Sequence, residues 1–359
     1  MRIIFLIFFI LLFGSCNNKQ EQYVLLISFD GFRSDYLDWY DTPNMDSFIN
    51  KGVKSEGLIP VFVSKTFPNH YSIATGLYVE NHGLIGNNFY DPRFNEHYSL
   101  KDRSKVEDPK FYGGEPIWIT AEKQGLKTAS YFWVGSEAPI NGTSPSIWKK
   151  YEHNSPFESR IDSIVSWFSL PINKRPKLCL LYFHEPDETG HNTGPKSKET
   201  AKVVTKMDSL FGVLLKKLES TPVSSNLNII AVSDHGMVEI NSNKTISLND
   251  YTDMSGIIQE GSGPFSLLYN KSQIPMEKIV QELNQAPHLK AYLKKDIPKR
   301  FHFKNHYRIK DALVLADESW YIKNQAISSS TKPYANIITG GTHGYDNQLK
   351  SMHALFIEK

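Results

Sequence analysis

Four short segments of the chain are apolar at consecutive positions, without alternation between apolar and polar residues. Such runs are typical of strands that are buried on both faces of a parallel sheet. The pattern therefore predicts four central strands, at residues 23–29, 128–133, 178–183 and 227–233.

A segment with helical periodicity lies between the last two of these runs. Between residues 197 and 218 the apolar residues recur at the 3.6-residue spacing of an amphipathic helix. Strands that alternate with helices indicate an α/β fold, and we expect a mostly parallel central sheet with helices on both faces. The stretches 78–115 and 283–325 have weaker periodicity, and we interpret them as insertions around the site rather than as separate domains.

The first sixteen residues differ from the rest of the chain. Arg2 is followed by an unbroken apolar run at 3–13 and then by the small residues Gly14 and Ser15. The run is too short to span a bilayer, and this order of charged, apolar and small residues is that of a secretory signal. Because Cys16 follows directly, residues 1–16 resemble a bacterial lipoprotein signal that ends at a lipidated cysteine; an ordinary signal peptide with an incidental cysteine is the alternative.

This signal predicts a protein that is exported and lipid-anchored to a bacterial membrane, facing the periplasm or the cell exterior. Residues 17–22 are polar and would form a tether, which leaves 23–359 as a single domain with insertions. Cys179 is then the one remaining cysteine, and its apolar neighbours indicate a position in the core. An intramolecular disulfide is therefore not expected.

The balance of charge argues against one class of partner. Lys and Arg total 40 against 38 for Asp and Glu, so no basic excess is available to hold a nucleic-acid backbone. We expect no stable nucleic-acid partner, contact with a membrane through the lipid anchor only, and a monomer or weak oligomer. Any recognition of phosphate must be local.

Carboxylates and histidines follow three of the four predicted strands, where ligands bind in α/β folds. Each one alone has an ordinary structural explanation, such as a turn residue or a helix cap. With one later histidine they provide enough ligands for two zinc ions that share a side-chain oxygen. Two metals about 4 Å apart can clamp the attacking and leaving oxygens of an in-line phosphoryl displacement. The six candidate ligands are Asp30, Asp187, His191, Asp234, His235 and His343.

Four longer motifs make the sequence recognisable: KTFPNH at 65–70, EPDETGH at 185–191, SDHGM at 233–237 and GTHGYDN at 341–347. In this order they resemble motifs of the nucleotide pyrophosphatase/phosphodiesterase family of the alkaline phosphatase superfamily. The resemblance extends from about Tyr23 to the C-terminus. It implies an alkaline-phosphatase-like fold and zinc-dependent hydrolysis of phosphodiester or pyrophosphate bonds, expected in nucleotides, with release of nucleoside 5'-monophosphates.

The resemblance also implies roles for the motif residues. Thr66 would be the nucleophile, forming a phospho-threonine intermediate, and would be a ligand of the second zinc. A threonine hydroxyl is a poor nucleophile at neutral pH, and a metal is one means of activating it. Asn87 matches the family asparagine that donates to a non-bridging phosphate oxygen. The first zinc would be held by Asp187, His191 and His343, and the second by Asp30, Asp234 and His235.

Other residues match positions that shape the base pocket in nucleotide-cleaving members of the family. Aromatic rings stack on bases largely regardless of base identity, so little base selectivity is expected; core packing is the alternative for these rings. Glu137 stands where relatives often have Asp, and Lys105 is the candidate to approach a distal phosphate. His184 stands where relatives commonly have Glu, and we assign it no ligand role. The aromatic candidates are Phe67, Trp133 and Tyr151.

Three other functions are compatible with parts of this pattern. A phosphomonoesterase of the same superfamily would keep both metals and Thr66 but would add cations for a dianionic phosphate, and Arg33 and Lys65 are the only cations beside the motifs. A choline-lipid phosphodiesterase would suit a lipid-anchored protein. A binding lipoprotein without catalysis would be expected to have lost the nucleophile or some ligands, and all seven residues are present here.

Overall fold

The apolar runs form the centre of one sheet in a computed structural model that describes residues 21–324 and 339–359. The predicted signal, Cys16 and most of the tether lie outside the described residues. Two of the four strands are shorter than predicted: the second ends at Tyr131 instead of Trp133, and the fourth ends at Val232 instead of Ser233. The four central strands are β1 (Tyr23–Phe29), β5 (Thr128–Tyr131), β7 (Leu178–Phe183) and β8 (Leu227–Val232).

Three short strands complete this seven-stranded sheet: β2 (Val53–Lys54), β6 (Ile147–Lys149) and β17 (Phe356–Glu358). The strand order is β2-β17-β8-β1-β7-β5-β6. The five strands from β8 to β6 are parallel to their neighbours, whereas β17 runs antiparallel to both β8 and β2. The mostly parallel sheet expected from the sequence is therefore confirmed.

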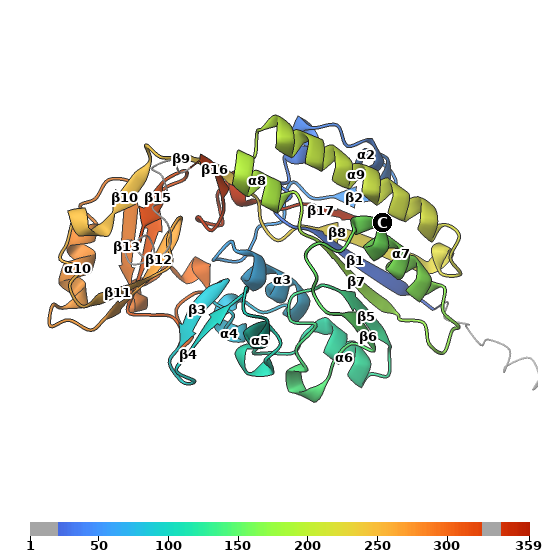
Figure 1. The fold of residues 1–359 in the computed structure, drawn as a ribbon, viewed down its shortest axis with the longest axis horizontal. Coiled ribbons are helices and arrows are strands. Elements are labelled where there is room, and N and C mark those ends of the chain that lie inside the picture. The colour runs from blue at the N-terminus through green and yellow to red at the C-terminus, as the bar shows by residue number, and fades with distance from the viewer. Residues whose placement is uncertain (1–20, 325–338) are drawn as a thin grey trace, which may run out of the picture.

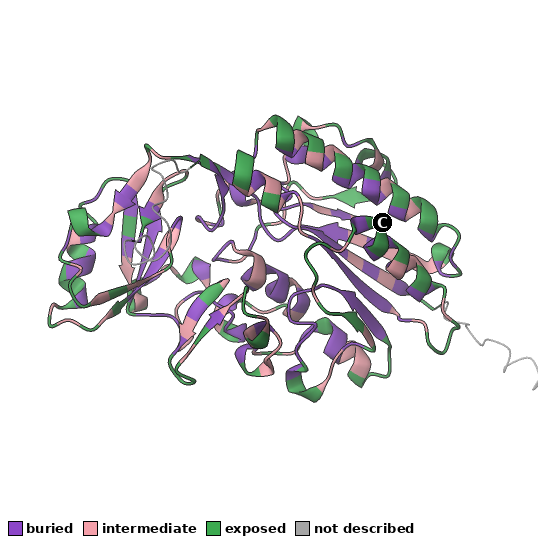
Figure 2. Cartoon of the chain, viewed as in Figure 1, coloured by how far each residue is buried: buried purple, intermediate pink, exposed green. Residues whose placement is uncertain are grey.

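Helices cover both faces of this sheet (Figure 1), as the α/β prediction requires. Alternate residues of the central strands point into two different hydrophobic clusters, so the strands are buried on both sides (Figure 2). Leu25, Ile27 and Cys179 belong to the first cluster, which confirms a core position for the cysteine. One face carries α2 (Pro43–Ile49), α7 (Phe157–Phe168) and α9 (Lys198–Leu218), and the other carries α3 (Thr66–Thr75) and α6 (Ile117–Lys123).

The long helix α9 begins where the sequence predicts. The side chain of Ser197 caps it by accepting a hydrogen bond from the backbone N–H of Thr200, at 3.0 Å. Its buried residues recur on one face and pack on the sheet. Within the described residues, no helix is both long enough and apolar enough to cross a membrane.

After β8 the chain leaves the main sheet and builds a smaller lobe (Figure 1). Its four-stranded antiparallel sheet has the order β11-β12-β14-β13 and packs on α10 in a third hydrophobic cluster. The stretch 283–325, with its weak periodicity, supplies two of these strands. The elements are β11 (Ile257–Glu260), β12 (Phe265–Asn270), α10 (Met276–Leu283), β13 (Leu289–Leu293) and β14 (Ala312–Ala316), beside the two-stranded pair β10 (Thr245–Ser247) and β15 (Tyr321–Lys323).

Two polar connections are among the contacts that join the smaller lobe to the main lobe, beside a hydrophobic cluster that both lobes share. One is the antiparallel pair of β9 (Val238–Asn241) and β16 (Thr339–Thr342). The other is a buried ion pair in which Arg308 Nε lies 2.6 Å from Asp91 Oδ2, while the same guanidinium donates to the carbonyls of Gly83 and Phe111. Arg308 thereby ties the smaller lobe to the stretch 78–115. That stretch contains α4 (Val79–His82), β3 (Asn88–Asp91), β4 (Glu96–Ser99) and α5 (Arg103–Val106).

Candidate active site

Three carboxylates meet at the carboxyl edge of the central sheet because they follow its three middle strands. Asp30 follows β1, Asp234 follows β8, and Asp187 begins α8 (Asp187–Thr193) shortly after β7. The backbone N–H of Asp187 donates to the carbonyl of Asp30 at 3.0 Å, which holds two of these strand ends together. Gly31 makes the approach possible, because it has φ +67° and a Cβ there would lie 2.9 Å from Asp187 Cα.

The first group of predicted ligands lies at the start of α8. His191 is one helical turn after Asp187, and its Nε2 lies 3.4 Å from Asp187 Oδ2. His343, in the loop after β16, brings its Nε2 to 3.1 Å from His191 Nε2 and 3.7 Å from Asp187 Oδ1. Two of the ligand atoms come from α8 and the third from a distant part of the chain, and all three lie within 4.8 Å of one another.

The second group is more deeply buried. His235 Nε2 lies 3.0 Å from Asp234 Oδ2 and 3.6 Å from Asp30 Oδ1. Thr66, the first residue of α3, places its Oγ1 3.3 Å from the same nitrogen. Ligand atoms of Asp30, Asp187 and His235 also lie within 4.8 Å of one another, so the two groups are adjoining.

The histidines are held in the form that binds a cation. In each, Nδ1 donates to a backbone carbonyl: His191 to Gly341 at 2.8 Å, His235 to Gly236 at 2.9 Å and His343 to Ser64 at 2.8 Å. Donation from Nδ1 leaves a lone pair on Nε2 in the neutral imidazole. All three Nε2 atoms therefore face the cluster as electron-pair donors, and two of them face each other.

The buried carboxylates of the cluster also lack the hydrogen-bond partners that would balance their charge. Among the described residues, Asp30 Oδ1, Asp187 Oδ1 and Asp234 Oδ2 are buried and have no hydrogen-bond partner. Buried polar atoms are normally satisfied, because an unpaired one costs about 1–3 kcal/mol or more. Burial raises the pKa of Asp30 well above its ordinary value, and the neighbouring charges of Asp234 and Asp187 raise it further. Unpaired oxygens and inward-facing nitrogens together fit bound metal ions.

Supporting contacts fix the orientation of these ligands. Tyr182 donates its hydroxyl to Asp30 Oδ2 at 2.6 Å, and the backbone N–H of Gly31 donates to Asp234 Oδ1 at 3.1 Å. His70 lies one turn after Thr66 on α3, with its Nδ1 3.4 Å from Asp234 Oδ2. No role for Tyr182 or His70 is predicted from the sequence. His70 could have been found from its place in the KTFPNH motif, whereas Tyr182 is hidden inside an apolar run.

The hydroxyl of Thr66 opens into a cavity of 520 Å³ that also exposes Asn87. Asn87 Oδ1 accepts a hydrogen bond from the backbone N–H of Phe67 at 2.9 Å. That bond orients the amide, so that its Nδ2 is left to donate into the cavity beside Thr66.

Four of the five predicted substrate contacts line this cavity, namely Phe67, Trp133, Glu137 and Tyr151. Trp133 is nearly fully buried, and its Nε1 donates to the carbonyl of His70 at 3.1 Å. Its indole ring is therefore held in one orientation along the cavity. Glu137 accepts from the backbone N–H of Tyr151 and pairs with the guanidinium of Arg103.

Lys105 is the exception. Its ammonium pairs with Glu96 on β4, and it does not line the cavity. Lys101 and Arg103 line the cavity instead. Residues two apart on a helix point in nearly opposite directions, so the start of α5 at Arg103 turns Lys105 away. The structure therefore does not place Lys105 where it was expected to meet a distal phosphate.

The chain was compared with known families, curated proteins and solved structures. A family model described as type I phosphodiesterase / nucleotide pyrophosphatase matches residues 24–346. A venom phosphodiesterase of Naja atra is 40% identical over 348 residues, covering 94% of this chain and 41% of the relative. Ectonucleotide pyrophosphatase/phosphodiesterase family member 3 of Bos taurus is 40% identical over 344 residues, covering 93% of this chain and 38% of the relative. The chain thus spans about two fifths of the length of these curated relatives.

The matched solved structures are covered over a larger share of their length than the curated relatives are. Murine ectonucleotide pyrophosphatase/phosphodiesterase 5, solved as an inactive variant in complex with AMP, superimposes with a TM-score of 0.86 at 34% sequence identity. The match covers 94% of this chain and 88% of that one. It confirms the alkaline-phosphatase-like fold that the motifs implied. By sequence and by fold, the chain belongs to the type I phosphodiesterase/nucleotide pyrophosphatase family.

Proposed function

We propose that this protein hydrolyses phosphodiester or pyrophosphate bonds in nucleotides and releases nucleoside 5'-monophosphates, with two zinc ions as cofactors. The family is metal-dependent. The observation that carries the proposal is the position of Thr66 Oγ1, which lies 3.3 Å from His235 Nε2 and opens into an aromatic-lined cavity. The AMP complex of the murine relative supports a nucleotide as the substrate.

Thr66 would attack phosphorus in the first step. A bond forms between its oxygen and phosphorus as the hydroxyl gives its proton to water, and the bond from phosphorus to the leaving oxygen breaks as that oxygen takes a proton from water. The N-terminal end of α3 directs its positive dipole toward the developing charge, and Asn87 donates to a non-bridging oxygen. Zinc ions in the two ligand groups, when bound, would lower the pKa of the attacking hydroxyl and neutralise the leaving oxygen.

Water would attack the phospho-threonine in the second step. The bond between Thr66 and phosphorus breaks, the hydroxyl regains a proton, and the nucleoside monophosphate leaves. Phe67 and Tyr151, on the cavity wall, would stack on the base throughout.

The cations near the cluster favour a diester over a monoester. A dianionic phosphate would need free positive groups, yet Arg33 pairs with Asp35 at 2.6 Å, donates to the Met237 carbonyl and does not line the cavity. Lys65 is buried beside the cluster, near enough to Asp187 and His343 for its charge to act on both, but it does not line the cavity. Arg103 does line it but is paired with Glu137.

Three chromogenic substrates test this proposal directly. We expect kcat/KM for a nitrophenyl nucleotide diester to exceed that for nitrophenyl phosphate and for nitrophenyl phosphocholine. Preference for nitrophenyl phosphate would identify a phosphomonoesterase. Preference for nitrophenyl phosphocholine would identify a choline-lipid phosphodiesterase.

Tyr151→Ala separates base recognition from phosphate chemistry. We expect KM for a nucleotide diester to rise about tenfold, because stacking on one base contributes about 1–3 kcal/mol. Nitrophenyl methyl phosphate has no base, so its KM should change much less. Trp148→Ala is the matched control, because Trp148 is an exposed aromatic residue that does not line the cavity. Equal losses on both substrates would assign Tyr151 a purely structural role.

We also infer that the chain is exported and anchored through a lipidated Cys16, as the apolar run and small residues before it suggest. We expect Cys16→Ser to abolish lipid attachment and to leave an active domain in the soluble fraction. Metabolic labelling with a radioactive fatty acid, followed by membrane fractionation, measures both effects. Membrane association that persists without Cys16 would contradict the anchor.

A further inference from the structure

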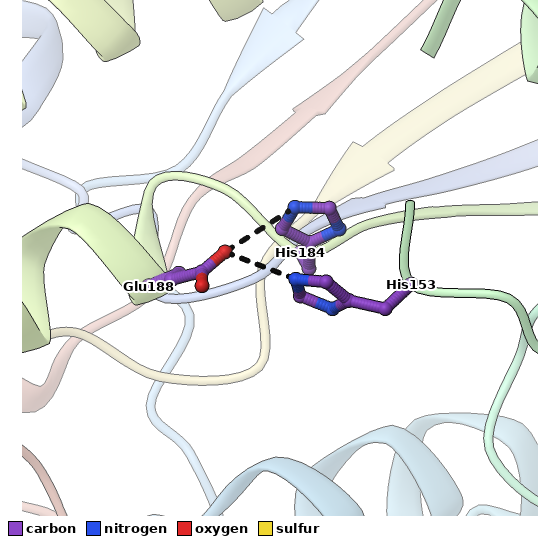
Figure 3. Close-up of side chains that lie close together, drawn as sticks. All are labelled: His153, His184 and Glu188. Carbon is purple, nitrogen blue, oxygen red and sulfur yellow. Dashed lines mark ion pairs between the residues drawn. The ribbon is translucent and has the colours of Figure 1, made fainter. Parts of the chain in front are cut away.

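A separate group of histidine and carboxylate side chains lies beside the candidate metal cluster. It consists of His153, His184 and Glu188, shown in Figure 3. His184 follows β7, Glu188 lies in the first turn of α8, and His153 comes from the loop between β6 and α7. All three line the same cavity as Thr66. The group includes none of the residues used in the proposed mechanism.

The ligand atoms of this group converge on one oxygen. His153 Nε2 lies 3.2 Å and His184 Nε2 lies 3.5 Å from Glu188 Oε2 (Figure 3). The two imidazole rings are stacked, with centroids 4.2 Å apart and planes inclined by 24°. Ligand atoms bonded to a tetrahedral zinc ion at 2.0–2.2 Å lie about 3.4 Å from each other. The two nitrogen–oxygen distances are close to that spacing, and rotation of one stacked imidazole would direct both in-plane lone pairs at one ion.

The partner of each Nδ1 atom decides which imidazole nitrogen carries the proton and whether Nε2 is free to bind an ion. His153 Nδ1 lies 3.0 Å from the hydroxyl of Tyr151, whose oxygen can accept a hydrogen bond from Nδ1–H and so leave Nε2 with its lone pair. His184 Nδ1 lies 3.4 Å from Arg160 Nη2, but that nitrogen also donates to the carbonyls of His153 and Ser155, at 3.3 and 3.1 Å. Because Arg160 can only donate, this contact places the proton of the neutral His184 on Nε2, and binding of an ion there requires the proton to move to Nδ1 and the 3.4 Å contact to open.

The charges of the surrounding side chains determine how tightly this group would bind a cation. Burial lowers the pKa of His184 to about 3, and the charge of Arg160 contributes, so the imidazole is neutral. Glu188 provides one negative charge, whereas Arg160 opposes a cation. His153 and Glu188 have side chains that are 46% and 49% exposed. We therefore expect an exchangeable ion that is held more weakly than ions in the buried cluster.

We propose that His153, His184 and Glu188 form a third metal site, which takes a divalent transition metal such as zinc. Two imidazoles and one carboxylate suit zinc, cobalt or nickel, whereas magnesium and calcium prefer oxygen ligands. Three protein ligands leave one coordination position open toward the cavity. The site goes beyond the proposed function, because it would hold an ion whether or not Thr66 is the nucleophile.

Zinc titration of purified protein tests the proposal. Wild type and variants are loaded with zinc, passed over a desalting column and titrated with Zn²⁺ by calorimetry. We expect the wild type to take up one equivalent more than Glu188→Gln and His153→Ala.

Glu152→Gln is the matched control, because Glu152 is an exposed neighbour outside the group, and it should bind as the wild type does. Both test residues are about half exposed, so the variants should fold; equal melting temperatures in chelator check this.

The test compares the zinc uptake of the wild type with that of the variants, and it does not use the total zinc content of any one protein. It is therefore independent of how many ions the buried cluster holds and of any activity. Equal zinc uptake by the wild type and both variants would overturn the proposal, as would the absence of an additional equivalent in the wild type.

Discussion

Exhaustive removal of metal ions is expected to reduce hydrolysis of a nucleotide diester by at least about 10³-fold, and added zinc should restore it. The physical reason lies in the buried cluster. Without cations, three adjoining carboxylates repel one another, and Asp30 Oδ1, Asp187 Oδ1 and Asp234 Oδ2 have no hydrogen-bond partner among the described residues. Measurement of zinc by mass spectrometry alongside turnover should show about two tightly held ions per chain in active protein.

A single substitution tests which residues hold these ions. Asp234→Asn keeps the size of the side chain and removes a charge from a fully buried position. We expect it to lower both zinc content and turnover. Asp46→Asn is the control, because Asp46 is an exposed acid on α2 and should leave both unchanged. Full activity after metal removal, or normal zinc content in Asp234→Asn, would contradict the assignment.

The parts of the fold that the sequence predicts are those set by local patterns. The strands of the main sheet are apolar at consecutive positions because both of their faces are buried, as Leu25 and Ile27 show on one side and Leu180 on the other. The positions of Asp30 and Asp234 in the site are predictable because both residues come at the carboxyl ends of strands, where ligands bind in such a sheet. Ser197 marks the start of α9 by its capping side chain. These features need no knowledge of distant contacts.

The features that sequence patterns missed depend on contacts between distant segments. α5 has a single turn, and the capping side chain of Asp102 fixes where it begins. That start directs Arg103 to the cavity and Lys105 away from it. In the antiparallel sheet of the smaller lobe, β14 is fully buried but the other three strands are short and partly exposed, so the pairing of the sheet is set by packing. The place of His343 in the cluster came from the resemblance of its motif, since no local pattern relates it to Asp187.

Thr66→Ala is expected to lower kcat for a nucleotide diester by at least about 10³-fold while zinc content falls little. The hydroxyl is the proposed attacking group, whereas the six other metal ligands remain. Thr66 does not cap α3 with its side chain, so its loss should not disturb the helix. Thr66→Ser keeps the hydroxyl and should retain part of the activity. Thr75→Ala is the matched control at the other end of α3 and should behave as the wild type.

The stereochemistry at phosphorus distinguishes the covalent route from direct attack by water. If Thr66 attacks first and water second, each in-line displacement inverts the configuration, and a chiral phosphorothioate diester gives product with retention. If water attacked directly, Thr66 would only orient the substrate, its loss would be milder, and the product would be inverted. Phosphorus NMR of the product from isotopically labelled water measures the outcome. Retention would require an intermediate, and Thr66 is the hydroxyl beside the ligand cluster that the geometry provides to form it. Inversion would exclude the phospho-threonine even if both metal groups bind zinc as proposed.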